Sequence, residues 1–312
     1  MPESPYDIIE FAAHEGTNDQ EILELLEDPE SAFVEKELTP EQQQMAVAYH
    51  ESLIGNPQLF IGAGNDGFVY EQPVQEGNPV CMKHIWEDLS VEIKQKRFDL
   101  LSTRLKELRK IQDHFEVVHA KRRSMQAKGI EFVAPNSPMV EAGIQVAARS
   151  ILEQAGFHNA VPSIFSVMRI ESKGEGSVES LPYVFNEVAD IIAMEKVNGR
   201  SIQDLILEYE KYFDVIERID VDAFKEALIK MLSTIHEKEL THQDVTNRNV
   251  MLDFGTLMPV IIDFGKACYR TGSFTKEQEI EHAEVICRTL SSFKKDPEKT
   301  RKELKRLLAI AF

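Results

Sequence analysis

The sequence predicts an α+β protein in which a strand-rich segment precedes a mostly helical one. β-prone residues flank a glycine-rich turn at residues 59–70 and continue into a further strand at residues 80–83. Apolar residues with helical spacing dominate residues 221–237, and two short apolar strands follow at 250–252 and 259–262. A chain of 312 residues with 43% hydrophobic content is long enough for two lobes with a small appendage.

The composition argues against several classes of protein. The formal net charge of −18 disfavours nonspecific binding to nucleic acid or to an anionic membrane, because like charges repel at long range. Cys81, Cys268 and Cys287 form no C-x-x-C pair, which predicts neither a zinc site nor a secreted disulfide scaffold. Residues 1–10 are acidic without an apolar core, and no run of about 18 apolar residues occurs. We therefore expect a cytoplasmic protein without a membrane span.

Residues 1–55 are predicted to form a helical N-terminal extension. Two pairs of residues have the spacing of a capping box, Thr17 with Gln20 and Thr39 with Gln42. They predict a short helix near residues 21–26 and a second one over residues 41–53. The extension either braces the first lobe or binds a partner.

The segment from Leu59 to Tyr70 matches the pattern G-x-G-x-x-G-x-V. Glycines let the main chain fold over phosphates without side-chain collision, so that N–H groups can point at anionic oxygens. A dinucleotide-binding fold uses a similar string, but a helix follows its glycines. Here Phe68-Val69-Tyr70 is β-prone, which favours a hairpin.

The stretch Leu240 to Leu252, with the later Asp263, has the residues that phosphoryl transfer requires. This chemistry needs a carboxylate to orient the acceptor hydroxyl, and an amide oxygen with a second carboxylate to hold magnesium. Asp244 can orient the hydroxyl, whereas Asn249 and Asp263 lie at the ends of two apolar strands. The spacing therefore predicts a phosphoryl-transfer site.

These motifs resemble the protein-kinase superfamily, whose catalytic loop has the form H-x-D-x-x-x-x-N and whose metal loop is D-F-G. The matching segments are His242 to Asn249 and Asp263-Phe264-Gly265. The resemblance covers roughly residues 58–290 and implies a bilobal kinase-like fold that binds ATP and Mg²⁺. It assigns Asp244 to catalysis and both Asn249 and Asp263 to the metal.

The resemblance also implies nucleotide-binding residues in the strand-rich segment. Lys83 corresponds to the lysine that contacts the ATP phosphates and pairs with a glutamate on helix C. Strand 191–194 would border the adenine, and the chain would cross between the lobes after it. The residues expected at the nucleotide are Gly62, Ala63, Gly64, Asn65, Asp66, Gly67, Val69, Lys83, Met194, Glu195 and Val197.

A helix is predicted from a cap at Ser137 to about Ala155, with a strand at residues 157–167 after it. Its position before that strand corresponds to helix C of the resemblance. Glu141 is then the expected catalytic partner of Lys83. Glu92 and Glu107 are alternatives for this role.

Residues 88–128 depart from the usual kinase pattern and have the apolar spacing of a long helix or helical hairpin. From residue 87 to residue 128 there are eleven Lys and Arg against seven Asp and Glu, a local excess of four positive charges in an acidic chain. The segment either packs on the first lobe through a solvated face or docks an acidic protein partner.

The remaining elements predict a compact second lobe. Loop residues are expected at 171–180, and helices at 201–208, 221–237, 276–292 and 296–311. The predicted organisation is an extension over 1–55, a first lobe over 56–196 and a second lobe over 197–312. The segment after Gly265 is short, and in this it resembles the corresponding segment of compact kinases. These are the RIO group, the kinase of the KEOPS complex, and the aminoglycoside and choline phosphotransferases.

The catalytic loop bears on the class of acceptor. Gln243 stands where many kinases have arginine, and Thr246 stands where serine/threonine kinases have lysine; Arg248 is similar to an arginine of tyrosine kinases. We expect an ATP-dependent kinase that phosphorylates a protein hydroxyl on Ser or Thr. A small-molecule phosphotransferase and a noncatalytic ATP-binding scaffold are the alternatives.

Overall fold

The computed structural model describes most of the chain, namely residues 6–16, 18–46, 60–63, 67–72, 80–85, 136–172, 189–270 and 275–311. Contacts divide the protein into two compact units. The first unit consists of Met1–Ala13, Phe33–Val133 and Ile164–Lys196. The second consists of His14–Ala32, Ala134–Ser163 and Val197–Phe312.

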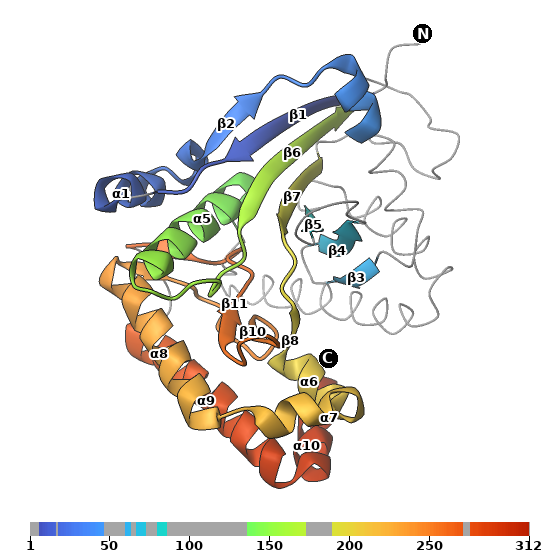
Figure 1. Ribbon diagram of the computed structural model, residues 1–312, viewed down its shortest axis with the longest axis vertical. Helices are drawn as coiled ribbons and strands as arrows, with labels where there is room; N and C mark the ends of the chain where they lie inside the picture. Colours follow the sequence, from blue (N-terminus) through green and yellow to red (C-terminus); the bar gives the residue numbers. More distant parts are fainter. Residues whose placement is uncertain are drawn as a thin grey trace, which may run out of the picture. The chain divides into compact units, whose positions relative to one another are not determined.

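The first unit contains a seven-stranded antiparallel sheet with the strand order β2-β1-β6-β7-β5-β4-β3 (Figure 1). The strands are β1 (Tyr6–Ala13), β2 (Phe33–Lys36), β3 (Phe60–Ala63), β4 (Gly67–Gln72), β5 (Val80–Ile85), β6 (Ile164–Ser172) and β7 (Ala189–Glu195). Met82 of β5, Val167 of β6 and Ile192 of β7 are buried, so the central strands carry the apolar core of this unit.

The prediction of a purely helical extension is wrong for Tyr6–Ala13 and Phe33–Lys36. Both segments are strands, and β1 pairs along β6 with Phe11 opposite Val167. The β-prone residues of β1 find their partner about 160 positions later in the chain. Short-range capping patterns contain no information about such a pairing, so they led to a helical prediction for the whole segment.

The two helices predicted in the extension are present in part. α1 (Asp19–Glu27) is capped by Asn18, whose side chain accepts from two main-chain N–H groups, and Thr17 lies outside the described residues. Thr39 and Gln42 form the predicted reciprocal capping box, with distances of 2.9 and 3.2 Å. Helical residues follow from 40 to 46, and the rest of the predicted helix lies outside the described residues.

The predicted hairpin is confirmed, because β4 follows the glycines where a dinucleotide fold would have a helix. β5 and β7 also match their predictions. The strand predicted at 157–167 instead begins at Ile164. The carbonyl groups of the residues before it are bonded elsewhere, since Ala160 O accepts from Ile261 N and Pro162 O accepts from the Gln145 side chain.

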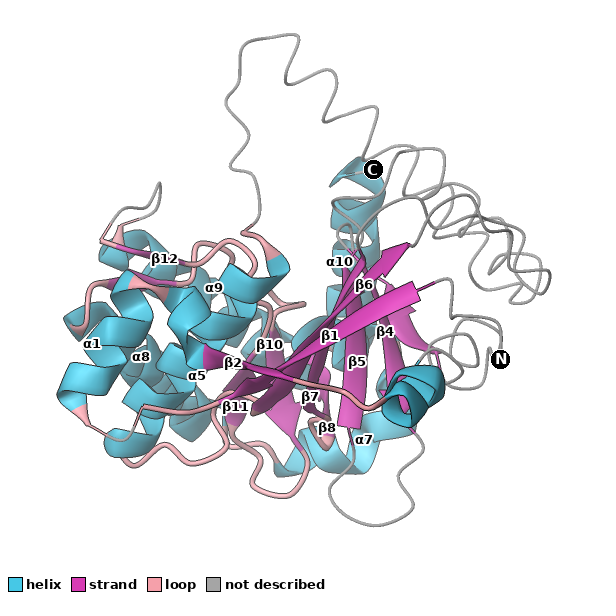
Figure 2. Ribbon diagram, turned by 90° about the horizontal axis from the view of Figure 1, so that it is seen from above, coloured by secondary structure: helices cyan, strands magenta, loops and turns pink. Residues whose placement is uncertain are grey.

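The second unit is mostly helical, as the cyan ribbons in Figure 2 illustrate. Besides α1 and a short 3-10 turn, η1 (Pro29–Ala32), it contains α5 (Pro138–Gln154), α6 (Ile202–Leu207), α7 (Tyr209–Arg218), α8 (Val221–Glu237), α9 (Lys276–Lys295) and α10 (Pro297–Ala311). α8 has the bounds that the sequence predicts and packs against α9, α5, β9 (Leu240–Thr241) and β11 (Pro259–Ile261). Its five buried apolar residues are Phe224, Leu228, Met231, Leu232 and Ile235. α7 was not predicted.

α5 confirms the helix predicted from Ser137, whose side chain accepts from Val140 N. The sequence places this helix in the predicted first lobe, whereas its contacts group it with the second unit. The physical reason is its broad buried face, which contacts α1, η1 and α8. None of the helices in the described ranges is long and apolar enough to cross a membrane.

Gly143→Ala is expected to lower the free energy of unfolding by about 1–3 kcal/mol through overpacking. A Cβ atom at Gly143 would lie 1.9 Å from the main-chain oxygen of Pro29, so α5 and η1 would have to separate. In an open helix interior the same substitution stabilises by roughly 0.5–1 kcal/mol. The sign measured by urea denaturation therefore decides whether α5 packs on this turn, and a stabilised variant would contradict the contact.

Two small sheets complete the second unit. β8 (Gly199–Ser201), β10 (Val250–Asp253) and β11 (Pro259–Ile261) form one, with β10 in the middle. β9 (Leu240–Thr241) pairs with β12 (Cys268–Tyr269). The segments that contain the predicted catalytic and metal loops connect these strands.

Candidate active site in the second unit

The hairpin of β10 and β11 brings Asn249 and Asp263 to the same end. Val250 lies opposite Ile261 in the antiparallel register, so the next residues along the pair are Asn249 and Ile262. Ile262 N donates to Asn249 O at 3.0 Å and continues the ladder past the strand ends. Asp263 follows directly, so the two predicted metal ligands lie one residue apart across the hairpin.

His242 connects the predicted catalytic loop to the predicted metal loop. Its ring is fully buried and lies 4.7 Å from the ring of Phe264, measured between centroids. Nε2 lies 3.0 Å from Ile262 O, and Nδ1 lies 3.3 Å from Asp244 N. A neutral imidazole with its proton on Nε2 satisfies both contacts, donating to the carbonyl and accepting from the Asp244 N–H. His242 thus fixes Asp244 relative to the segment that ends in Asp263.

Asn249 adds a second connection within the loop. Its Nδ2 donates to Asp244 O at 3.0 Å, which leaves the amide Oδ1 as the atom able to bind a cation. The Asp244 carboxylate is 28% exposed, and its Oδ2 accepts from Lys266 Nζ at 2.8 Å. The described contacts therefore hold the main chain of Asp244 rigidly and keep its carboxylate open to solvent.

Two residues of the site have main-chain conformations that residues other than glycine rarely adopt. The φ angle is +64° at Gln243 and +66° at Asp263, both in the left-handed region. Such conformations cost of order 1–3 kcal/mol for a typical residue and concentrate at functional sites. Asp is among the residues that tolerate them best, so the unfavourable position is Gln243.

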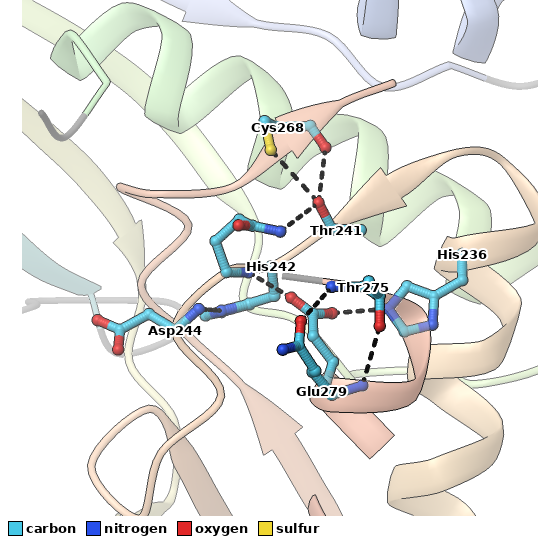
Figure 3. Close-up of polar contacts among 9 residues, drawn as sticks. His236, Thr241, His242, Asp244, Cys268, Thr275 and Glu279 are labelled. Atoms are coloured by element: carbon cyan, nitrogen blue, oxygen red, sulfur yellow. Dashed lines mark hydrogen bonds and ion pairs between the residues drawn. The ribbon is translucent and has the colours of Figure 1, made fainter. Parts of the chain in front are cut away.

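Glu279 of α9 holds the strained Gln243 in place (Figure 3). Its side chain is 1% exposed; Oε1 accepts from the Gln243 N–H, and Oε2 lies 2.6 Å from Nε2 of His236 on α8. Burial by itself raises the pKa of Glu279, but the hydrogen bonds from His236 and from Gln243 outweigh it and lower this pKa below its ordinary value. The carboxylate is therefore charged and fully engaged at neutral pH.

The side chain of Gln243 turns toward the small sheet of β9 and β12. Its Nε2 donates to Thr241 Oγ1 at 2.8 Å, and the Thr241 hydroxyl contacts Cys268 O and Sγ at 3.3 Å (Figure 3). Gln243 therefore has a structural role in these contacts.

Burial disfavours the thiolate form of the three cysteines. All three thiols are free. Burial raises the pKa of Cys81 to about 12 and that of Cys287 to about 11, and it also raises the pKa of Cys268. Since the thiolate is the reactive form, burial lowers the nucleophilicity of these thiols at neutral pH.

The carboxylates of Glu141 and Asp263 both lie close to Gly265. A Cβ atom at Gly265 would lie 3.2 Å from Glu141 Oε2 and 3.4 Å from Asp263 Oδ1. Asn136, just before α5, donates its N–H to Gly265 O at 2.6 Å and its Nδ2 to Ala267 O at 2.7 Å. The start of α5 is thus tied to the metal loop, and the pairing of Glu141 with Lys83 stays a prediction.

The predicted nucleotide-binding residues that the structure describes lie in the first unit, except for Val197. Val69 of β4 and Ile192 of β7 flank Lys83 on β5 in direct register, which puts Val69 and Lys83 on one face of the sheet. Gly62, Ala63 and Gly67 lie in the strands of the β3–β4 hairpin, and Met194 and Glu195 lie in β7. Gly64, Asn65 and Asp66 lie outside the described residues. Glu92, Glu107 and the predicted docking segment 88–128 also lie outside them.

Sequence reasoning missed three residues of the second-unit site, namely His236, Lys266 and Glu279. Glu279 lies 36 positions after the residue that it holds, and no spacing rule connects the two. Lys266 directly follows the D-F-G motif, and this position was the only feature of the sequence that could have placed Lys266 in the site. No protein-family model and no curated protein matches this sequence.

Proposed function

We propose that this protein is an ATP-dependent kinase of the protein-kinase-like superfamily that transfers the γ-phosphoryl group to a protein hydroxyl. The observation that carries the proposal is the linked geometry of the second unit. His242 joins the Asp244 main chain to the metal loop, and the hairpin register brings Asn249 to the same end as Asp263. A base in the loop before β10, and an amide and a second carboxylate at one end of the β10–β11 hairpin, are the parts that phosphoryl transfer requires.

Asp244 is the residue proposed to receive the acceptor hydroxyl. Lys266 occupies Oδ2, so Oδ1 is the oxygen that can accept the hydroxyl hydrogen. The Asp244 side chain is 28% exposed, so an acceptor can approach it from the solvent. Asn249 holds the Asp244 main chain in place during the reaction.

Asn249 and Asp263 are the proposed magnesium ligands. An amide oxygen and a carboxylate are hard donors, which suit this cation. Among the described residues no group of three or more His, Cys, Asp and Glu side chains could hold a metal by itself. This agrees with the usual coordination of Mg²⁺, in which one or two carboxylates bind the ion and water and phosphate oxygens complete its coordination shell. When bound, the metal neutralises charge on the phosphates.

The glycine-rich hairpin and Lys83 are proposed to bind the ATP phosphates, and Met194, Glu195 and Val197 to border the adenine. The support is the β3–β4 hairpin and the register that aligns Lys83 with Val69. Main-chain N–H groups and a lysine are suitable partners for anionic oxygens.

Incubation with γ-labelled ATP, alone and with cell extract split into protein and small-molecule fractions, tests the proposal. Label in a protein band supports it, whereas label in a small molecule identifies the phosphotransferase alternative. Bound ATP without any transfer in either fraction identifies a scaffold and would overturn the proposed activity. The Asp244→Asn variant serves as the inactive control.

Asp263→Asn is expected to weaken magnesium-dependent ATP binding at least about tenfold, because it removes the charged ligand. Asn tolerates the φ of +66° at this position, so the fold should be retained. Thermal-shift titration with ATP measures the effect with and without magnesium. Equal stabilisation of wild type and variant by MgATP would show that Asp263 is no ligand.

A further inference from the structure

Lys266 forms an ion pair with the proposed catalytic carboxylate. Its Nζ lies 2.8 Å from Asp244 Oδ2, and the two side chains are 32% and 28% exposed. Partly exposed ion pairs of this kind contribute little to stability, because water still screens them. Stability therefore does not explain why a lysine is placed against this carboxylate.

The main chain holds Lys266 from both sides. Phe264 before it is fully buried, and Ala267 after it is 1% exposed, with Ala267 N donating to Phe264 O at 3.0 Å. Asn136 bonds the carbonyls of Gly265 and Ala267. Lys266 is thus a charged side chain that extends from an anchored turn, so its ammonium group is preorganised beside Asp244.

The reaction proposed for this site needs a cation at that place. A phosphoryl group that approaches an ionised carboxylate brings negative oxygens next to a negative charge. An ammonium group has three donors, so one can remain on Asp244 Oδ2 while the other two bind oxygens of the moving phosphoryl group. Thr246 and Asn247 of the neighbouring loop are neutral, and Arg248 is an exposed cation. Among the described residues, Lys266 is the cation recorded in contact with the Asp244 carboxylate.

We propose that Lys266 is the residue that binds the transferred phosphoryl group on its acceptor side, an inference that rests on the proposed kinase activity. The acceptor O–H bond breaks as its proton passes to Asp244 Oδ1, and the acceptor oxygen bonds to phosphorus. The bond from phosphorus to the bridging oxygen breaks, and ADP leaves with that electron pair. Lys266 transfers no proton in this step.

Lys266→Met tests this role, with Lys266→Arg as the variant that keeps the charge. The matched control is Lys225→Met, because Lys225 forms a similar ion pair with Glu284, 3.0 Å long with side chains 41% and 37% exposed. We expect Lys266→Met to lower the transfer rate by roughly 10²-fold, the effect of removing one preorganised donor. The arginine variant should lose less than the methionine variant, and the control should match wild type.

A binding measurement separates this role from a structural one. Aluminium fluoride with MgADP supplies a phosphoryl-like anion without turnover, and calorimetry gives the affinity with and without it. Lys266→Met should bind MgADP as wild type does but lose the gain in affinity from aluminium fluoride. A methionine variant that keeps both the transfer rate and this gain would overturn the inference while leaving the kinase activity intact. If wild type neither transfers phosphate nor gains affinity, the proposed kinase activity is contradicted, and so is the inference that rests on it.

Discussion

Asp244→Asn is expected to lower phosphoryl transfer by about 10²–10⁴-fold, the usual contribution of a positioned acid/base group. Asn has the same shape but no carboxylate to take the hydroxyl proton. The contacts from His242 and from Asn249 reach main-chain atoms of residue 244, so they survive the substitution. The loop should therefore keep its conformation, and MgATP affinity should be unchanged.

Initial rates with γ-labelled ATP and calorimetric MgATP titrations measure the two quantities separately. Asp214→Asn is a suitable control, because Asp214 is an exposed carboxylate on α7 outside the site. Parental rates in Asp244→Asn would mean that the catalytic loop has been misassigned. A loss of nucleotide binding equal to the loss of rate would instead point to a role in binding.

Local periodicity was sufficient to predict the helices that bury one regular apolar face. In α8 the apolar residues recur every three or four positions, from Phe224 to Ile235, and each is buried. The hairpin of β10 and β11 was predictable for a related reason, since each strand is a short apolar run next to a polar residue of the proposed site. Both kinds of signal lie within about 20 residues.

Features that depend on distant partners were not predictable in this way. β1 is a strand because it pairs with β6. Gln243 is held in its left-handed conformation by the hydrogen bond that its N–H donates to Glu279 Oε1. Neither partner is close in sequence. The positions of Asp244, Asn249 and Asp263 could thus be predicted, whereas the residues that hold them in position could not.

Glu279→Gln is expected to lower both the stability and the transfer rate of this protein. A glutamine has one acceptor oxygen, which cannot serve both His236 and the Gln243 N–H in their present positions. One buried donor then loses its partner, which costs roughly 1–3 kcal/mol. Glu279→Ala removes both contacts and breaks a buried pair, so a larger loss of about 3–5 kcal/mol is expected.

The transfer rate should fall because Gln243 precedes the catalytic residue directly. Without its anchor the strained peptide can relax, and a displacement of about 1 Å at Asp244 can cost up to about 10²-fold. Glu284→Gln is the matched control, since Glu284 lies on the same helix in an exposed pair with Lys225. Assays well below the melting temperatures of all variants separate the rate effect from unfolding. Unchanged rates in Glu279→Gln would show that the anchor has no role in the reaction.

The pH dependence of stability provides the sharper test of the buried carboxylate. The pKa of Glu279 in the folded protein lies below its ordinary value of 4.5, because hydrogen bonds from His236 and Gln243 outweigh the effect of burial. A lowered pKa means that the charged form stabilises the fold above the unfolded-state pKa, and that this contribution is lost as the pH falls through the folded-state pKa. Urea denaturation should therefore show a wild type more stable than Glu279→Gln at pH 7, with the difference shrinking below about pH 4.5. A difference that grows on acidification would mean that Glu279 is protonated in the folded protein, and that its contacts with His236 and Gln243 are those of a neutral acid.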